Sequence, residues 1–202
     1  MYFVLLGIAL WGAFCVVIVW MRVKQKRFDS EEQQALFLEA IEEPLQRGDY
    51  DMASEICQSD RRAICQLTQM GIDNRGLGYA KVKQLVADRF QRDVLADLDN
   101  WLSWVYTVIK AAPMIGLLGT VMGMMAAFEK LAVPGTVPDP TELAGDIQFA
   151  LITTACGLAI AIPLVLCTAS INIRIKKMED LVSYGLNQFL EFFKEALIRH
   201  PK

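Results

Sequence analysis

The chain has 202 residues, of which 54% are hydrophobic and 21% are charged, and its formal net charge is −3. This composition is typical of a membrane protein with a substantial polar part and excludes an ordinary soluble domain. The slightly acidic balance does not favour nucleic acid as a partner. The only histidine, His200, lies near the end of the chain, and the five cysteines match no zinc or CxxC spacing. We therefore expect free thiols, no metal site and no cofactor.

Residues 1–21 carry no charge and are about as long as the ~20 residues that a spanning helix needs. Basic residues follow this apolar run, beginning at Arg22, whereas a secretory signal carries its positive charge before the apolar run. The segment 1–21 is therefore predicted to be an uncleaved first transmembrane helix.

Residues 22–100 form a polar insert that is predicted to be helical. Ser30 followed by Gln33 is typical of a helix start, Gly48 of a helix end, and Asp49 of the cap of a second helix. A loop is expected over 73–78 because of its glycines. Beyond it, apolar residues recur every three or four positions: Val82, Leu85, Val86, Phe90, Val94, Leu98 and Leu102. No helix breaker follows them, so one long second helix should continue from the insert into the membrane.

The second predicted span, 101–129, contains the uncharged stretch AAPMIGLLGTVMGMMAAF. Gly116, Gly119 and Gly123 are three, four and seven positions apart, so they share one helix face. Small residues on one face let membrane helices approach closely. Two interpretations are open at this point. Either this face packs helices within one chain, or it joins subunits or a partner helix, in which case Gly119→Leu should disrupt an assembly.

Residues 130–146 are predicted to be a short loop, residues 147–173 a third uncharged span, and residues 174–202 an amphipathic C-terminal helix. Basic residues are concentrated after the first and third spans, and such residues are retained in the cytoplasm. The expected topology therefore has the N-terminus outside, the insert and the C-terminal helix in the cytoplasm, and the 130–146 loop outside.

Small and hydroxylated residues of the third span are expected to form one helical stripe. Its members are Ala150, Thr154, Gly157, Ala161 and Thr168. The threonines have two possible roles. In the first, each hydroxyl bonds a carbonyl of its own helix four residues back. In the second, Thr120 and Thr154 form a polar belt that lines an interior passage. A hydroxyl can hydrate an ion without the cost of a buried charge, which is several kcal/mol. Thr153, about 100° away from Thr154 around the helix, should tolerate valine better.

The chain carries no enzyme motif. GxGxxG, a P-loop, GxSxG and HExxH are all absent from the sequence. We therefore predict no catalytic residue and no enzymatic activity.

The stretch APMIGLLGTVMGMMAAF and, some thirty residues later, ALITTACGLAIAIP resemble the MotA/TolQ/ExbB proton-channel family, in particular its TolQ/ExbB branch. The resemblance implies an all-α integral membrane protein of the bacterial inner membrane with three transmembrane helices. It further implies a ring of five copies whose second and third spans line a pore. The pore would hold the helices of a single-span ExbD/TolR-like partner, whose transmembrane aspartate takes up protons. Such an assembly converts proton-motive force into mechanical work in the cell envelope.

Residue by residue, Thr120 matches the threonine of the family's GTVxG segment and Thr154 that of its ATAxGL segment. The resemblance thus implies that these two residues line the ion pathway. The residues expected to form the helix-packing and pore face are Pro113, Gly116, Gly119, Gly123, Ala150, Gly157, Ala161 and Pro163.

Two positions depart from the family pattern. The usual glutamate five residues before the second threonine is Phe149, with Gln148 and Asp146 nearby, and a common asparagine is Ala169. The protonatable carboxylate is therefore expected to come from the partner.

Three other classes of function are compatible with a helical membrane protein. A structural membrane scaffold, in which glycine stripes only pack helices, is the alternative. A small-solute transporter would show inverted repeats or broken helices, and the sequence has neither. A flagellar-type stator is less favoured, because that branch has four spans and a longer chain.

Overall fold

The computed structural model describes residues 2–26, 28, 30–58, 60, 62–132 and 139–199. Within these ranges the chain is helical and contains no strand, and three helices are long and apolar enough to cross a membrane. The prediction of an all-α integral membrane protein is thereby confirmed. His200 and the middle of the predicted loop, 133–138, lie outside the described residues.

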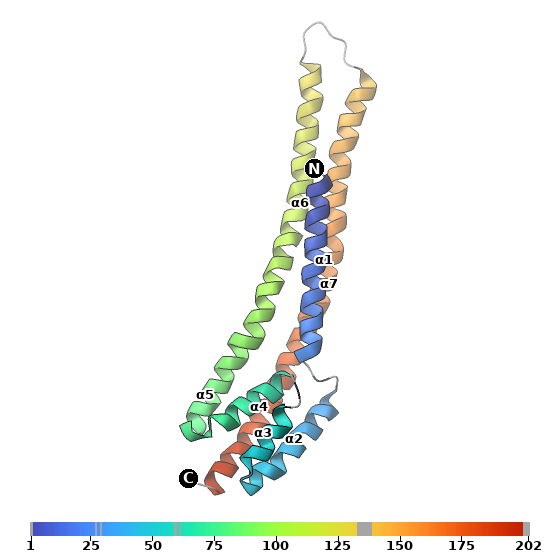
Figure 1. The fold of residues 1–202 in the computed structure, drawn as a ribbon. Coiled ribbons are helices and arrows are strands. Elements are labelled where there is room, and N and C mark those ends of the chain that lie inside the picture. Colours follow the sequence, from blue (N-terminus) through green and yellow to red (C-terminus); the bar gives the residue numbers. More distant parts are fainter. Residues whose placement is uncertain are drawn as a thin grey trace. The chain divides into compact units, whose positions relative to one another are not determined.

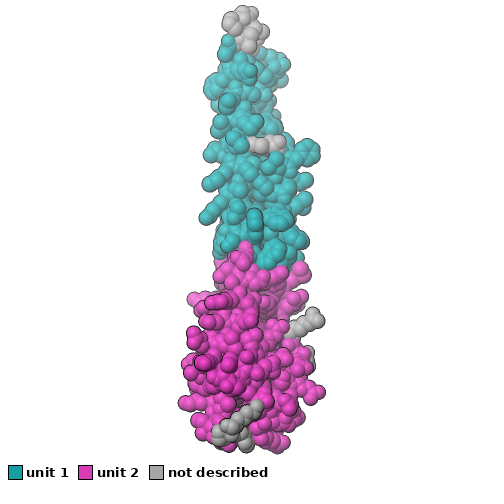
Figure 2. Space-filling view, turned by 60° about the vertical axis from the view of Figure 1, so that its left-hand side comes forward, with its two compact units in different colours: residues 1–18, 101–170 teal, residues 19–100, 171–202 magenta. Residues whose placement is uncertain are grey.

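The described chain divides into two compact units, coloured separately in Figure 2. Unit 1 comprises residues 1–18 and 101–170, and unit 2 comprises residues 19–100 and 171–202. Unit 1 therefore contains most of the apolar segments, and unit 2 contains the polar insert with the C-terminal part of the chain.

Three long helices, α1 (Tyr2–Lys26), α6 (Ala96–Leu131) and α7 (Pro140–Arg199), carry the apolar segments (Figure 1). The third span and the amphipathic C-terminal segment, which were predicted separately, form the single helix α7 of 60 residues. Pro113 and Pro163 lie inside α6 and α7 without ending either helix.

The predicted long second helix is confirmed. Helix α5 (Tyr79–Arg89) passes through a π-helical segment, Phe90–Leu95, into α6, so that 53 residues from Tyr79 to Leu131 are continuously helical. A π-helical segment replaces the usual i→i−4 bonds locally. The insert and the second span are thus parts of one helix.

Unit 2 contains three short helices, α2 (Glu31–Arg47), α3 (Tyr50–Gln58) and α4 (Ala63–Asp73). Two predicted caps are confirmed: Ser30 Oγ accepts from Gln33 N at 3.3 Å, and Asp49 Oδ1 accepts from Met52 N at 3.1 Å.

One of these short helices ends at a glycine. Gly48 ends α2 with φ 78°, a left-handed conformation that favours glycine. The predicted 73–78 loop was only partly right, because Asp73 still belongs to α4 and Arg75–Leu77 form a 3-10 turn.

The core of unit 2 is built on aromatic residues of α7. Phe189 and Phe193 are fully buried, with ring centroids 5.5 Å apart. A Cβ on Gly71 would lie 2.9 Å from Phe189 Cε1, so α4 can approach α7 only because this position lacks a side chain. The amphipathic pattern of the C-terminal segment therefore reflects a core within the chain.

All five cysteines are free, as predicted. Cys57 and Cys65 are buried in unit 2, and burial raises the pKa of each thiol to about 12. Both thiols are therefore protonated at neutral pH, which makes them poor nucleophiles.

Helix α1 packs against α6 and α7 within unit 1. A Cβ on Gly12 would lie 2.8 Å from Val108 Cγ1 and 2.9 Å from Leu164 Cδ1. Trp11 of α1 meets Trp104 of α6 edge to face, with centroids 6.2 Å apart. Gly12 is thus one position at which the first span contacts both of the other two.

Candidate functional site

Helices α6 and α7 come into backbone contact in unit 1, where their glycines face each other. A Cβ on Gly116 would lie 2.9 Å from Thr153 O and 3.0 Å from Thr154 Cα. A Cβ on Gly157 would lie 2.6 Å from the carbonyl oxygen of Ala112. Because these neighbouring atoms belong to backbones, no side-chain movement could relieve either overlap.

The other two glycines of the α6 face continue the same contact. A Cβ on Gly119 would lie 2.7 Å from Thr153 Cβ, and a Cβ on Gly123 would lie 2.7 Å from Ala150 Cβ. Of the two interpretations left open by the sequence, packing within one chain accounts for this face. Disruption by Gly119→Leu would consequently report on the chain's own hairpin, so it is not the test of assembly that the sequence suggested.

The threonine hydroxyls differ in what they bond. Thr154 Oγ1 donates to Gly116 O at 3.0 Å, across the two helices. Thr120 Oγ1 donates to Leu117 O at 2.6 Å, and Thr168 Oγ1 donates to Leu164 O at 2.7 Å, each within its own helix. Thr154 therefore ties α7 to α6, whereas Thr120 and Thr168 follow the local pattern.

Thr153 was expected to lie outside the stripe of small residues on α7, but the structure places it inside the contact with α6. Its side chain is fully buried, and its Oγ1 donates to Ala150 O at 2.7 Å, with Gly116 O a further 3.3 Å contact. The expected stripe is otherwise buried, at Ala150, Gly157, Ala161 and Thr168. Thr154, only partly buried, lies at the edge of this stripe and Thr153 lies within it.

This placement changes the choice of control. Valine at Thr153 would remove a buried hydroxyl next to Gly119, so its effect on packing and on any ion pathway could not be separated. Thr168 is the better control, because it is buried and bonds only its own helix.

The hydroxyls of Thr120 and Thr154 are both engaged as donors to backbone carbonyls. Each oxygen still has acceptor lone pairs. Thr120 lies four residues after Gly116 on α6, hence one helical turn from the carbonyl that Thr154 bonds. Together Thr120 and Thr154 place one hydroxyl oxygen that can accept a hydrogen bond on each of the two helices.

Acidic and basic side chains lie outside the apolar segments of this helix pair. Residues 111–128 and 147–173 contain no Asp, Glu, Lys, Arg or His. Lys130 Nζ lies 2.8 Å from Asp146 Oδ2 and 3.6 Å from Glu142 Oε2, so an ion pair joins the end of α6 to the beginning of α7. Asp146, which lies near the position of the missing glutamate, is therefore neutralised by an internal partner.

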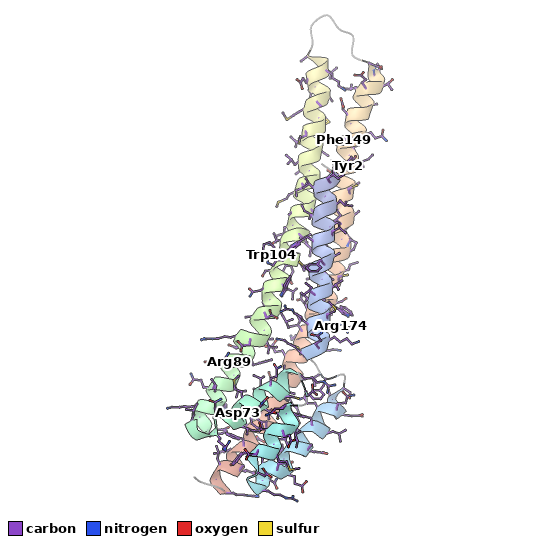
Figure 3. The ribbon with its side chains drawn as sticks, viewed as in Figure 1. Tyr2, Asp73, Arg89, Trp104, Phe149 and Arg174 are labelled. Atoms are coloured by element: carbon purple, nitrogen blue, oxygen red, sulfur yellow. The ribbon has the colours of Figure 1, made fainter. Side chains whose placement is uncertain are left out.

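Phe149 occupies the position at which the sequence departs from the family pattern. It is 39% exposed, and its ring meets that of Tyr2 of α1 edge to face, with centroids 5.3 Å apart (Figure 3). At this position the family's glutamate is therefore replaced by a phenylalanine, whose ring makes an apolar contact with the first span.

Some residues at this site were missed by the sequence reasoning. Thr153, Gly12 and Ala112 all take part in close helix contacts. Gly12 could have been noticed as a glycine in a span, but nothing in the pattern identified its partners. Among the described residues, no three His, Cys, Asp or Glu side chains are grouped so that they could hold a metal ion.

Comparison with known proteins places the site inside a family match. The profile of the MotA/TolQ/ExbB proton channel family matches residues 62–183, which include the glycines and threonines of α6 and α7.

Individual relatives share shorter segments with the chain. A putative biopolymer transport protein ExbB homolog of Methanothermobacter thermautotrophicus is 37% identical over 109 residues, which are 52% of this chain and 38% of the relative. Biopolymer transport protein ExbB of Helicobacter pylori is 43% identical over 67 residues, 33% of this chain and 46% of the relative. The Tol-Pal system protein TolQ of Haemophilus influenzae is 36% identical over 106 residues, 52% of this chain and 44% of the relative. The chain thus covers less than half the length of each.

Proposed function

Because the chain belongs to the MotA/TolQ/ExbB proton channel family, we propose that it is a ring-forming inner-membrane subunit of a proton-driven motor. In this function, proton flow through the assembly is converted into mechanical work in the cell envelope. The N-terminus would face the periplasm and the C-terminus the cytoplasm, in accordance with the basic residues that follow the first and third spans.

The observation that carries the proposal is the composition of the α6–α7 pair. Its apolar segments contain no acidic or basic side chain, yet Thr120 and Thr154 place hydroxyl oxygens on both helices. A pathway of this kind can contact a proton carrier but cannot itself store the proton. The proton-carrying group would therefore be the transmembrane aspartate of a single-span ExbD/TolR-like partner.

The hydrogen bonds suggest how the threonines would act on such a carboxyl group. Both hydroxyl protons are already donated to backbone carbonyls, so the free lone pairs can accept a hydrogen bond from a protonated carboxyl group. The same lone pairs cannot hydrogen-bond to a deprotonated carboxylate, which itself only accepts hydrogen bonds. Such a lining would favour the protonated form of the carboxyl group inside the pathway, and the proton would be released where water is available.

An exposed apolar surface on α6 is available for contacts within the membrane. Its side chains are each at least 49% exposed in the single chain: Met114, Leu117, Leu118, Val121, Met122 and Met125. In a membrane this surface would contact lipid, neighbouring copies or the partner's helix. Five copies are expected from the family.

The available driving force limits what one step can do. A transmembrane potential supplies about 2.3 kcal/mol per elementary charge per 100 mV. One proton therefore supplies only a small amount of work, and the motor would have to repeat the step many times.

Native mass spectrometry tests the proposed assembly. The chain would be co-expressed with a single-span protein that has an aspartate near the start of its helix, and purified in mild detergent. We expect one species with five copies of the chain and bound partner. A monodisperse monomer without partner would contradict the proposal.

The alternative of a structural scaffold also has an observation in its favour. The α6 glycines pack against α7, and the hydroxyls of Thr120 and Thr154 are bonded within the chain. Helix packing alone could therefore explain these residue types. A scaffold would form an oligomer too, so ion movement and not assembly distinguishes the two functions.

A further inference from the structure

An arginine of α7 lies over the ring of a tryptophan of α1 in unit 2. Figure 3 labels the arginine, Arg174. Arg174 Cζ lies 4.1 Å from the centroid of the Trp20 ring. We propose that Trp20, Lys24, Arg174 and Lys177, the basic–aromatic patch, bind the headgroup of an anionic phospholipid. The proposal does not depend on proton conduction.

The patch lies where both helices change from apolar to charged sequence. The uncharged run of α1 ends at Met21, and that of α7 ends at Ile173. Trp20 and Arg174 thus mark the boundary between the hydrocarbon region and the headgroup region on two adjacent helices. Tryptophan is enriched at this depth, because its ring is amphipathic.

The charges of the patch extend in one direction from this boundary. Lys24 follows Trp20 by four residues and Lys177 follows Arg174 by three, so each lies one turn further along the same face. All four side chains are exposed. Since both helices leave their apolar runs here, both lysines lie on the headgroup side of the stacked pair.

The cations of the patch differ in their surroundings, since Lys177 lines a pocket that also contains Glu31, Glu32 and Asp180. Among the described residues, Lys24, Arg174 and Lys177 form no ion pair. Neighbouring basic residues of α1 behave differently: Arg22 pairs with Asp97, and Lys26 Nζ donates to Asp93 O at 3.2 Å. The patch therefore presents three cations without an ion-pair partner among the described residues, although the whole chain is slightly acidic.

The stacked arginine is suited to a phosphate group. A guanidinium that lies over an indole keeps the N–H groups at its edge available, and these can donate two parallel hydrogen bonds to phosphate oxygens. The cation–π contact also holds the guanidinium in place before a ligand binds. The two lysines add positive charge without this directional requirement.

Apolar neighbours favour a lipid over a soluble phosphate compound. Met21 and Ile173, each next to a patch residue, are 50% and 60% exposed. In a membrane they would contact the acyl chains of the lipid whose phosphate the arginine binds. A soluble phosphate ester has no apolar part to occupy this surface.

Lipid titration of the full-length chain tests the proposal. Purified protein in mild detergent would be titrated with phosphatidylglycerol or phosphatidylcholine, and bound lipid counted by native mass spectrometry. We expect Arg174→Gln with Lys177→Gln to lower phosphatidylglycerol affinity roughly tenfold or more, and to change phosphatidylcholine binding little. The matched control, Lys81→Gln with Lys83→Gln, removes the same charge from an exposed part of α5 and should bind like the parent.

A further variant tests the role of the Arg174 guanidinium separately from its charge. Arg174→Lys keeps the charge but loses the planar group, and we expect it to bind phosphatidylglycerol less tightly than the parent. Equal affinity of Arg174→Lys would overturn the role of the stacked guanidinium. Unchanged phosphatidylglycerol binding by the double patch variant, or an equal loss in the α5 control, would overturn the site. Displacement of the lipid by equimolar glycerol phosphate would show a free-phosphate site instead.

Discussion

A Gly157→Leu chain should fail to form a stable α6–α7 hairpin. The first atom of any side chain at this position would lie 2.6 Å from the Ala112 carbonyl oxygen, and the Gly116 Cα is only 3.3 Å away. Both neighbours are backbone atoms, so the helices would have to move apart. Overpacking a core usually costs ~1–3 kcal/mol, and we expect a loss above this range. The yield of folded protein and the thermal midpoint in detergent, followed by far-UV circular dichroism, would measure it.

Two glycines provide matched controls for this experiment. Gly145 lies on the same helix, and Gly7 lies on α1, and neither has an atom within 4 Å of the place where a Cβ would lie. Gly145→Leu and Gly7→Leu should therefore fold like the parent. A Gly157→Leu chain with parental yield and thermal midpoint would show that the close helix approach is not needed.

The helical architecture could largely be predicted from the sequence. Uncharged runs indicated three spans, and local hydrogen-bond signals at Ser30, Gly48 and Asp49 indicated the short helices. These features can be predicted from the sequence because each depends on residues that are close together in the chain. The continuity of α5 into α6 followed in the same way, from the absence of a breaker before residue 101.

The contacts between helices could be predicted only in part. Spacings of three and four fit a stripe through Thr154 as well as one through Thr153, and the structure places Thr153 inside the contact. The helical period of 3.6 residues does not show which of two adjacent residues at the edge of a helix face lies inside the contact. Likewise, the glycine pattern showed that something approaches α6 closely, but it could not show that α7 of the same chain does so.

Thr154→Val should lower proton movement through the assembly while leaving its size unchanged. Valine has nearly the shape of threonine but lacks the hydroxyl, so Gly116 O loses the 3.0 Å bond and the pathway loses an acceptor. The lost bond should cost only about 1 kcal/mol of stability. We expect proton flux to fall roughly tenfold, equivalent to ~1.4 kcal/mol. Thr120→Val should act in the same direction, and serine at either position should retain more flux than valine.

Thr168→Val is the control for these variants. Thr168 is buried on the same helix, and its hydroxyl bonds only Leu164 O. This variant should keep parental flux, because it changes polarity away from Thr120 and Thr154. If Thr120→Val and Thr154→Val also keep parental flux, their hydroxyls serve only the backbone, and the polar-belt interpretation is wrong.

Proton uptake into lipid vesicles tests the central claim most directly, which is that this chain forms a pathway whose proton-carrying group belongs to a partner. Vesicles would contain the chain alone, the chain with its single-span partner, or the chain with a partner whose transmembrane aspartate is changed to asparagine. Under an imposed membrane potential, an internal pH-sensitive dye should report uptake only with the unmodified partner. Equal uptake by the chain alone, or no uptake in any of the three preparations, would contradict this claim.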